Sequence, residues 1–363
     1  MITGKGLKKI QTKNIGDVFF APDPYTVPIT MSAPALLAII LAASLVPQSR
    51  MKHFIYFERD RERIQETRFL STSAVAGAQL KYTWRELEPS ENQHRLDLIE
   101  DDLNYLTSHG KRLFIQLQDV SFDTAIVNVP EYLLRGQEFH GGVSAQYHFS
   151  DDDEKEYVKE GWVARRWDKA VMKRFHLLLQ ALGKKFDGRI EGINLPESSV
   201  GFGEKGLLHP EGFDDTSYID ALKETMKVLK ASFPTSCVLQ YANFLPGEFL
   251  PWKDQGYLRG FYEIMATLGV GGGGPDLLVN KKSHMNNSYR FIREYSARIP
   301  MGAAVQWGNY EHINPETRKQ VTITDITEFG ERYLGLTYIF WCTQEPYYSR
   351  DVIPFLEAGD TNR

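Results

Sequence analysis

Cysteine is scarce in this chain, which has 363 residues but only two cysteines, Cys237 and Cys342. Both fall in or at the end of predicted strands that are far apart in strand order, so we expect two buried thiols and no disulfide. Two thiols cannot build a metal cluster, and the nine histidines show no ligand spacing such as His-Glu-x-x-His. The sequence therefore indicates no dedicated metal site.

An excess of basic residues is also lacking. The chain has 42 Lys and Arg against 47 Asp and Glu, a net charge of -5, which argues against a nucleic-acid partner because phosphate binding needs clustered basic side chains. Hydrophobic residues make up 42%, enough for a sizeable core. Six tryptophans are present, and several lie in predicted loops, a pattern that favours a site that stacks on flat apolar faces of a ligand.

A membrane-spanning run is missing as well. The most apolar stretch, Ala33–Val46, is too short and is interrupted by Pro34, so we expect no stable membrane insertion. It has the length of a signal-peptide core and ends in small residues suited to cleavage. We therefore interpret residues 1–50 as an N-terminal extension with a signal segment at 31–49, and expect export to the periplasm or the exterior. The alternative is a cytoplasmic protein in which this run is a hydrophobic helix packed on the main domain.

From residue 51 onward, apolar strand candidates alternate with amphipathic helical segments such as Leu96–His109 and Asp168–Phe186. Alternating strands and helices indicate a parallel sheet covered on both faces, and eight units fit a (β/α)8 barrel over residues 51–363. A doubly wound open sheet is the alternative, but no glycine-rich dinucleotide turn follows the first strand. The eight predicted strands are His53–Phe57, Gly77–Tyr82, Arg112–Leu117, Arg189–Asn194, Ser236–Ala242, Gly269–Leu278, Met301–Gln306 and Leu336–Trp341.

One connection, from Val120 to Trp167, is longer than a simple strand-to-helix loop requires. Long loops on a rigid scaffold are often lids or walls of binding sites, and we predict that role here. The acidic run Asp151–Glu154 within it lacks the glycine and the spaced oxygen ligands of a calcium loop, so we interpret it as a solvated loop tip.

The position best suited to chemistry follows the fourth predicted strand. Glu197 lies just beyond an apolar strand, with Asn194 before it and a glycine-rich loop after it. Groups at the carboxyl ends of barrel strands face the mouth of the barrel, and a carboxyl group set against apolar walls has a raised pKa and can donate a proton. The alternative is a loop carboxylate that caps a backbone amide.

The block Trp84-Arg85-Glu-Leu-Glu88-Pro89, followed by Leu96, Ile99 and Leu103, resembles the second-strand pattern of the retaining glycoside hydrolases with (β/α)8 barrels. That superfamily includes β-galactosidases, β-mannanases and cellulases. The resemblance runs weakly over residues 53–355, and only residues 84–89 are specific. It implies a glycosidase that acts on an oligo- or polysaccharide without a cofactor, with Glu197 as the general acid/base and Trp341 as the aromatic platform on the eighth strand.

The chain departs from this pattern at two places. Leu195 and Pro196 separate Asn194 from Glu197, whereas the family has the asparagine directly before the glutamate. Gln306 stands where the family carries its nucleophilic glutamate at the end of the seventh strand. A glutamine cannot form the glycosyl ester, so the two-step retaining mechanism is not expected to operate through this residue.

Four other carboxylates are candidates for the second catalytic group. We expect Glu345, beyond the eighth strand, to serve as base or nucleophile, with a salt bridge to Arg350 as its alternative role. Glu311 could reach back from the loop after the seventh strand. Asp119 or Asp276 could act as a base on water and would give inversion.

Polar and aromatic side chains at the predicted strand ends complete the candidate site. Amides and guanidinium groups match sugar hydroxyls, and tryptophan rings stack on pyranose faces, although for each residue alone packing or hydrogen bonding in the core is the alternative. The residues assigned to substrate binding are Trp84, Arg85, Gln118, Asp119, Asn194, Tyr241, Asn243, Asp276, Gln306, Trp307 and Trp341.

Two other functional classes fit the same sequence. A catalytically silent barrel that binds glycans is favoured by Gln306, and a different barrel enzyme, such as a lyase or an amide hydrolase, could use the same face. Replacing Glu197 by glutamine separates them, because a binder keeps its affinity whereas an enzyme loses turnover and still binds substrate.

Overall fold

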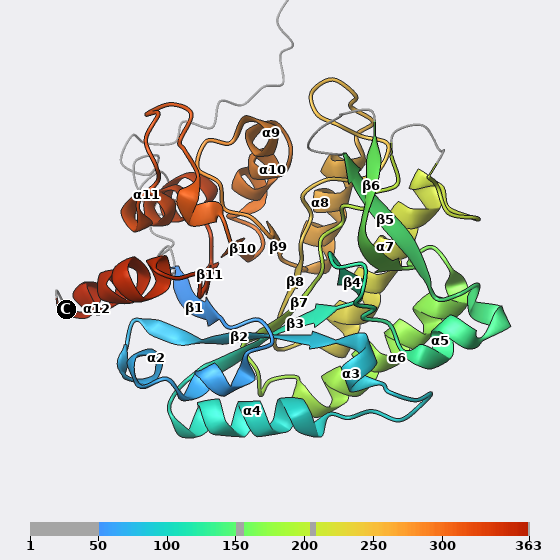
Figure 1. The fold of residues 1–363 in the computed structure, drawn as a ribbon, viewed down its shortest axis with the longest axis horizontal. Helices are drawn as coiled ribbons and strands as arrows, with labels where there is room; N and C mark the ends of the chain where they lie inside the picture. Colours follow the sequence, from blue (N-terminus) through green and yellow to red (C-terminus); the bar gives the residue numbers. More distant parts are fainter. Residues whose placement is uncertain (1–50, 150–155, 204–207, 362–363) are drawn as a thin grey trace, which may run out of the picture. The chain divides into compact units, whose positions relative to one another are not determined.

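An eight-stranded parallel sheet forms the centre of the computed structural model, which describes residues 51–149, 156–203 and 208–361 (Figure 1). The strands follow the order β8-β7-β3-β2-β1-β11-β10-β9, and a parallel bridge between Leu239 and Gly271 joins the two ends. Gln240 N also donates to Gly271 O (3.0 Å) and Ala242 N to Gly273 O (2.9 Å). The predicted (β/α)8 barrel is therefore confirmed.

Each predicted strand of the barrel is present, with shorter bounds for most. They are β1 (Lys52–Tyr56), β2 (Val75–Thr83), β3 (Arg112–Gln118), β7 (Gly192–Leu195), β8 (Cys237–Gln240), β9 (Gly272–Gly274), β10 (Met301–Val305) and β11 (Tyr338–Cys342). The strands are rich in Val, Ile, Leu and Phe because both faces of a barrel strand are buried.

Helices cover the outside of the barrel (Figure 1). The longest two, α6 and α7, begin at aspartates whose side chains cap them: Asp168 accepts from Ala170 N and Val171 N, and Asp214 accepts from Ser217 N. The helices are α2 (Thr67–Ser71), α3 (Trp84–Leu87), α4 (Asp97–Ser108), α5 (Glu131–Arg135), α6 (Lys169–Phe186), α7 (Asp215–Ser232), α8 (Tyr257–Leu268), α9 (Lys282–Asn286), α10 (Ser288–Tyr295), α11 (Ile323–Glu328) and α12 (Ile353–Thr361). Short 3-10 or π-helical turns lie at Arg61–Gln65, Gln137–Phe139, Asn309–Glu311, Phe329–Leu334 and Tyr348–Val352.

The long connection between β3 and α6 folds into a second, antiparallel sheet. It consists of β4 (Val120–Ser121), β5 (Val143–Phe149) and β6 (Tyr157–Ala164) in the order β4-β6-β5 (Figure 1). Tyr147 N donates to Gly201 O (2.8 Å), so β5 lies against the loop that follows β7. A side chain at Gly201 would place its Cβ 2.1 Å from Tyr147 O, which explains the glycine. The connection is thus a wall beside the loop that carries Glu197.

The interior of the barrel is aromatic toward the amino-terminal ends of the strands and polar toward their carboxyl ends. Phe54, Phe114 and Phe340 come from β1, β3 and β11 and meet with ring centroids 4.9–6.0 Å apart. Nearer the carboxyl ends of the strands, buried amides replace them, as described below for the site. This change of chemistry along the barrel axis places the polar layer beneath the mouth.

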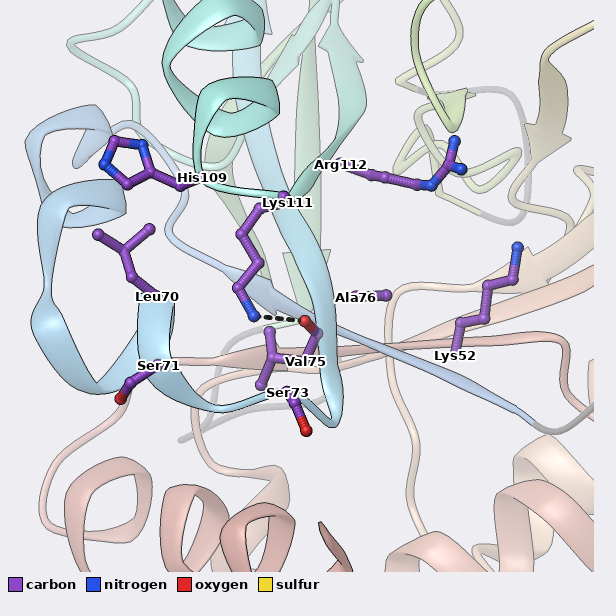
Figure 2. Close-up of a pocket in the computed structure, with 10 residues that line it drawn as sticks. Lys52, Leu70, Ser71, Ser73, Val75, Ala76, His109, Lys111 and Arg112 are labelled. Carbon is purple, nitrogen blue, oxygen red and sulfur yellow. Dashed lines mark hydrogen bonds between the residues drawn. The ribbon is translucent and has the colours of Figure 1, made fainter.

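A cavity of about 480 Å³ opens at the opposite end, where β1, β2 and β3 begin (Figure 2). Lys111 donates to Thr72 O (2.7 Å) and to Val75 O (2.8 Å), so its charge is held by main-chain carbonyls. Lys52 and Arg112 pair with Glu191. Because the basic groups are partnered within the protein and lie at the amino-terminal ends of the strands, we do not place the chemistry here.

Some predictions fall outside the described residues. These are the N-terminal extension at 1–50 with its signal segment at 31–49, and the acidic run at 151–154. Within the part of the chain that the structure describes, none of the helices combines the length and apolar character that a bilayer crossing needs.

Candidate active site at the mouth of the barrel

Glu197 lies two residues beyond the end of β7. Hydrogen bonds hold the main chain around it against the end of β8 and the residues that follow β8. The side chain of Gln240 donates to Pro196 O (2.6 Å), and Ser198 N donates to Tyr241 O (2.9 Å). Ser198 Oγ donates to Phe244 O (2.7 Å). These bonds fix the position of Glu197 on a rigid strand end, as a catalytic group requires.

The pKa of the Glu197 carboxyl group is raised, which favours its neutral, protonated form. Burial raises its pKa from the ordinary value of 4.5 to about 7. A hydrogen bond from Asn243 Nδ2 to Glu197 Oε2 (2.5 Å) opposes this shift, and the negative charge of Asp276 adds to it. A carboxyl group with a pKa near neutrality can give up a proton and take it back at physiological pH.

Asp276 is the carboxylate whose charge acts most strongly on Glu197. It follows β9, on the same edge of the barrel. Asn309 Nδ2 donates to Asp276 Oδ1 (3.0 Å), and Tyr289 Oη donates to its main-chain oxygen (3.0 Å). Glu197 and Asp276 thus follow β7 and β9 at the same edge of the barrel, and the charge of Asp276 contributes to the raised pKa of Glu197.

Asp119 has a different partner. Arg166 donates to both of its carboxylate oxygens, from Nε to Oδ2 (2.9 Å) and from Nη2 to Oδ1 (2.6 Å), and both side chains are buried. Arg166 Nη1 also donates to Glu197 O (2.9 Å). Asp119 is thus committed to an ion pair that holds the main chain of Glu197, which makes it a positioning residue and a poor general base.

Glu345 and Glu311 are both exposed. Glu345 Oε1 accepts from Ser349 Oγ (2.6 Å), and its other oxygen accepts from Ser349 N (3.3 Å), so the carboxylate caps the turn that follows it. Glu311 Oε1 accepts from Gln344 Nε2 (2.9 Å). Neither is among the charges that act most strongly on Glu197. The expected catalytic role of Glu345 gains no support from this placement, and its predicted alternative partner, Arg350, pairs with Asp351 instead.

The tryptophans and arginine from the family-like pattern are structural in this fold. Trp84 is fully buried, packs edge-on against Phe175, and donates from Nε1 to Glu88 Oε2 (2.9 Å). Arg85 Nε donates to Val129 O (2.9 Å) and therefore ties α3 to the connection that follows β3. Trp341 is also fully buried and donates from Nε1 to His53 Nδ1 (3.1 Å). Neither tryptophan exposes a ring face to a ligand, so we leave both out of the site.

A layer of buried polar side chains forms the floor beneath Glu197. Gln79 Nε2 donates to Asn194 Oδ1 (2.8 Å), and Tyr56 Oη donates to Gln116 Oε1 (2.7 Å). Tyr241 lies in the same layer, beside the Gln79 amide. Gln79 Oε1 and Tyr241 Oη have no ideally placed partner among the described residues, but the two side chains interact, because burial raises the pKa of Tyr241 and Gln79 lowers it.

The remaining predicted site residues lie at the ends of β3 and β10. Gln118 ends β3 and is half-buried. Gln306 directly follows β10, and its main-chain N–H donates to Asn309 Oδ1 (3.0 Å), the same asparagine that holds Asp276. Trp307 is 60% exposed and donates from Nε1 to Glu58 Oε1 (3.0 Å). Trp307 is therefore accessible to a ligand, unlike the buried Trp84 and Trp341.

Sequence reasoning missed two charged groups that act on Glu197. Arg166 lowers its pKa, and Glu160 on β6 raises it. Both come from the connection between β3 and α6, whose antiparallel sheet was not predicted. The available signal was the strict alternation of apolar and polar residues in Val143–Phe149, which is typical of a strand with one buried face.

No group of three or more His, Cys, Asp or Glu side chains within the described ranges is arranged to hold a metal ion. The two cysteines are free thiols, as expected. Burial raises the pKa of Cys237 to about 12 and that of Cys342 to about 11, so both are protonated and unreactive at neutral pH.

We compared the chain with known proteins to find similar sequences and folds. No family model matches the sequence, and no curated protein matches it. Among solved structures, the catalytic domain of a β-amylase from Paenibacillus polymyxa is 8% identical, with a TM-score of 0.54, over 81% of this chain and 92% of that one. A xylanase of Thermotoga petrophila in complex with xylobiose is 7% identical, with a TM-score of 0.47, over 80% and 82% of the two chains. The expected resemblance to (β/α)8-barrel glycoside hydrolases is confirmed at the level of the fold.

Proposed function

We propose that this barrel hydrolyses a glycosidic bond in a carbohydrate, with Glu197 as the general acid and Asp276 as the general base. The observation that carries the proposal is the pair of carboxylates at the ends of β7 and β9, one of them with a pKa of about 7. A carboxyl group with a raised pKa is suited to act as an acid, and a second carboxylate at the same edge of the barrel can supply the base. The similarity of the fold to a β-amylase domain agrees with a carbohydrate substrate.

The chemistry follows from the protonation states. Protonated Glu197 donates its proton to the glycosidic oxygen as the bond to the anomeric carbon breaks, and the leaving sugar departs as an alcohol. Asp276 takes a proton from a water molecule that attacks the anomeric carbon from the opposite face. The product has an inverted anomeric configuration, and no covalent intermediate forms, which agrees with glutamine at position 306.

Neighbouring residues have supporting roles in this proposal. Asn243 holds Glu197 Oε2, and Arg166, which is fixed by Asp119, holds the main chain of Glu197. The buried amide layer of Gln79 and Asn194, with the Tyr241 hydroxyl, makes the barrel interior beneath the two carboxylates polar. In this arrangement the substrate ring lies above the polar floor and between the two carboxylates.

A screen of the purified protein against aryl glycosides and polysaccharides tests the proposal, with Glu197→Gln and Asp276→Asn in parallel. We expect hydrolysis by the wild type and a loss of at least about 10²-fold in kcat for each variant, because each removes a proton-transfer group. NMR of the first-formed sugar should show inversion. Retention of configuration, or full activity in Asp276→Asn, would rule out the assigned roles.

A glycan-binding barrel without turnover is the second candidate. Gln306 favours it, because the position at which retaining enzymes of this fold carry their nucleophile lacks a carboxylate. Saturable glycan binding with equal affinity in wild type and Glu197→Gln, and no hydrolysis of any substrate, would support this function over the enzyme.

A further inference from the structure

The helices α6 and α7 lie side by side on the outside of the barrel (Figure 1), and a groove of about 690 Å³ runs between residues 166–180 and 217–228. Near their carboxyl ends the two helices approach closely, because a Cβ at Gly183 would lie only 2.1 Å from Ser232 O. The groove therefore occupies the amino-terminal parts of the helices, where side chains larger than glycine hold them apart.

The floor of this groove is apolar. Met172 of α6 lines it together with Ala221 and Val228 of α7, and Leu177 on its edge is 36% exposed. Apolar side chains on the outer face of two barrel helices add little to the core, and an apolar patch framed by charged residues is typical of a protein–protein contact. The groove thus has the make-up of an interface.

The two sides of the groove carry opposite charges. On α6, the exposed Lys169 and Lys173 line it, and on α7 the exposed Asp220 and Glu224 do so. Residues four positions apart lie on the same face of a helix, so each helix presents two like charges toward the groove. We call the two lysines the basic stripe and the two carboxylates the acidic stripe.

The acidic stripe is open to a further partner. Asp220 pairs with Lys223 (2.9 Å) and Glu224 with Lys227 (2.9 Å), in both cases three residues along the same helix. The two carboxylates are 64% and 57% exposed, so these pairs are weak. Within the described ranges, no salt bridge crosses the groove to join the two stripes.

The two stripes lie at the same level along the groove. His176 Nε2 forms a hydrogen bond with Thr225 Oγ1 (3.0 Å), which sets the register of the two helices. Lys173 precedes His176 by three residues, and Asp220 and Glu224 precede Thr225 by five and one, so Lys173 lies level with the stretch between the two carboxylates. The helices also run in the same direction, because their carboxyl ends meet.

This arrangement makes the surface complementary to itself. A two-fold rotation about an axis parallel to the groove places α6 of one copy over α7 of the other, at two equivalent places. Each basic stripe then faces an acidic stripe, and the two apolar floors meet between them. A two-fold axis across the groove would instead place like charges together, which opposes association.

We infer that α6 and α7 form the interface of a two-fold symmetric dimer, in which the occupant of the groove is a second copy of this chain. The charge pattern favours a second copy over a different protein, because the groove itself supplies both signs of charge in the positions that a two-fold rotation brings together. The inference is independent of the proposed function, since it concerns the outer face of the barrel and not its mouth.

Sedimentation velocity of the full chain tests the inference. We expect the wild type to sediment as a dimer at micromolar concentration and to dissociate as salt is added, because salt screens exposed charges. Lys169→Glu with Lys173→Glu makes both sides of the groove acidic, and Asp220→Lys with Glu224→Lys makes both sides basic. Each double variant alone should dimerise at least about tenfold more weakly than the wild type.

Mixing the two double variants in equal amounts is the decisive step. In a mixed pair, each stripe again faces one of opposite charge at both contacts, so we expect the dimer to return. Its return would also show that both variants are folded. Arg332→Glu is the matched control, because Arg332 is 77% exposed and lies outside the groove, and its reversal should leave the dimer unchanged.

Three results would overturn the inference. A monomeric wild type would leave the groove to a protein other than this chain. A dimer that both double variants keep at full strength would use another face of the barrel. A mixture that stays monomeric, although circular dichroism shows both variants folded, would rule out the placement of α6 over α7.

Discussion

Glu197 illustrates how one residue acquires its chemistry from its surroundings. Its position after an apolar strand was enough to predict a raised pKa from the sequence. The size of that shift depends on Asn243, Asp276 and Arg166, which come from three other parts of the chain. Such contacts cannot be read from spacing along the sequence, because they arise only when the barrel closes.

The choice of the second carboxylate shows the same limit. Glu345 follows a predicted strand, whereas Asp276 falls inside the predicted strand Gly269–Leu278, and the sequence offered no reason to prefer Asp276. In the folded chain, Glu345 turns toward Ser349 and is exposed, whereas Asp276 acts electrostatically on Glu197. The direction of a side chain beyond a strand end depends on the turn that follows, which residue type alone does not fix.

The raised pKa of Glu197 predicts how stability depends on pH. The folded pKa of about 7 lies above the ordinary 4.5, so between these values the folded state holds a proton that the unfolded state has lost. Stability from this group is therefore full below about pH 4.5 and is lost as the pH rises through about 7, by about 2–3 kcal/mol. Chemical denaturation at pH 4.5 and at pH 8 tests this prediction. Between these two pH values, the free energy of unfolding of the wild type should fall by about 2–3 kcal/mol relative to that of Glu197→Gln. A difference between the two proteins that does not change with pH would contradict the prediction.

At the scale of elements, the family-like block at the end of β2 has a structural role. Glu88 is fully buried and accepts from Trp84, and it forms an ion pair with Arg174 of α6. The pattern predicted the strand-to-helix turn correctly, but it did not show that its aromatic and acidic residues face the helix layer. The same residue pattern can serve packing or chemistry. The direction in which the side chains point shows which of the two roles they have.

Removing the charge of Glu88 should destabilise the protein. Glu88→Gln leaves the Arg174 guanidinium, which is 9% exposed, without its buried counterion, and we expect a loss of about 3 kcal/mol in the free energy of unfolding. Glu91→Gln is the matched control, because Glu91 also pairs with Arg174 but is 55% exposed, and its loss should cost less than about 1 kcal/mol. Urea denaturation measures both, and equal effects would argue against a structural role for the buried pair.

The whole molecule depends on closure of the barrel between β8, β9 and β10. The glycines at 271–273 allow the close approach of neighbouring strands and side chains. At Gly273, where φ is 151°, an added Cβ would lie 1.7 Å from Gly302 O. The alternation of strands and helices was sufficient to predict a barrel, whereas the positions at which strands touch could not be predicted without the register.

Gly273→Ala should therefore disrupt the closure of the barrel. We expect it to lose more than about 3 kcal/mol of stability, because the contact is with backbone that cannot move aside. Gly274→Ala is the neighbouring control, since an added Cβ there meets no atom within 4 Å. Thermal unfolding followed by circular dichroism compares the two, and a near-neutral Gly273→Ala would show that β9 and β10 are not packed as described.

The most direct test of the account is the titration of the Glu197 carboxyl group by carbon-13 NMR, in protein labelled at the glutamate side-chain carboxyls, with Glu197→Gln to assign its signal. We predict a pKa near 7 for Glu197 in the wild type and a lower value in Asp276→Asn, because that variant removes the negative charge that opposes ionisation. A pKa near 4.5 that does not respond to Asp276→Asn would contradict the acid and base pair on which the proposed function rests.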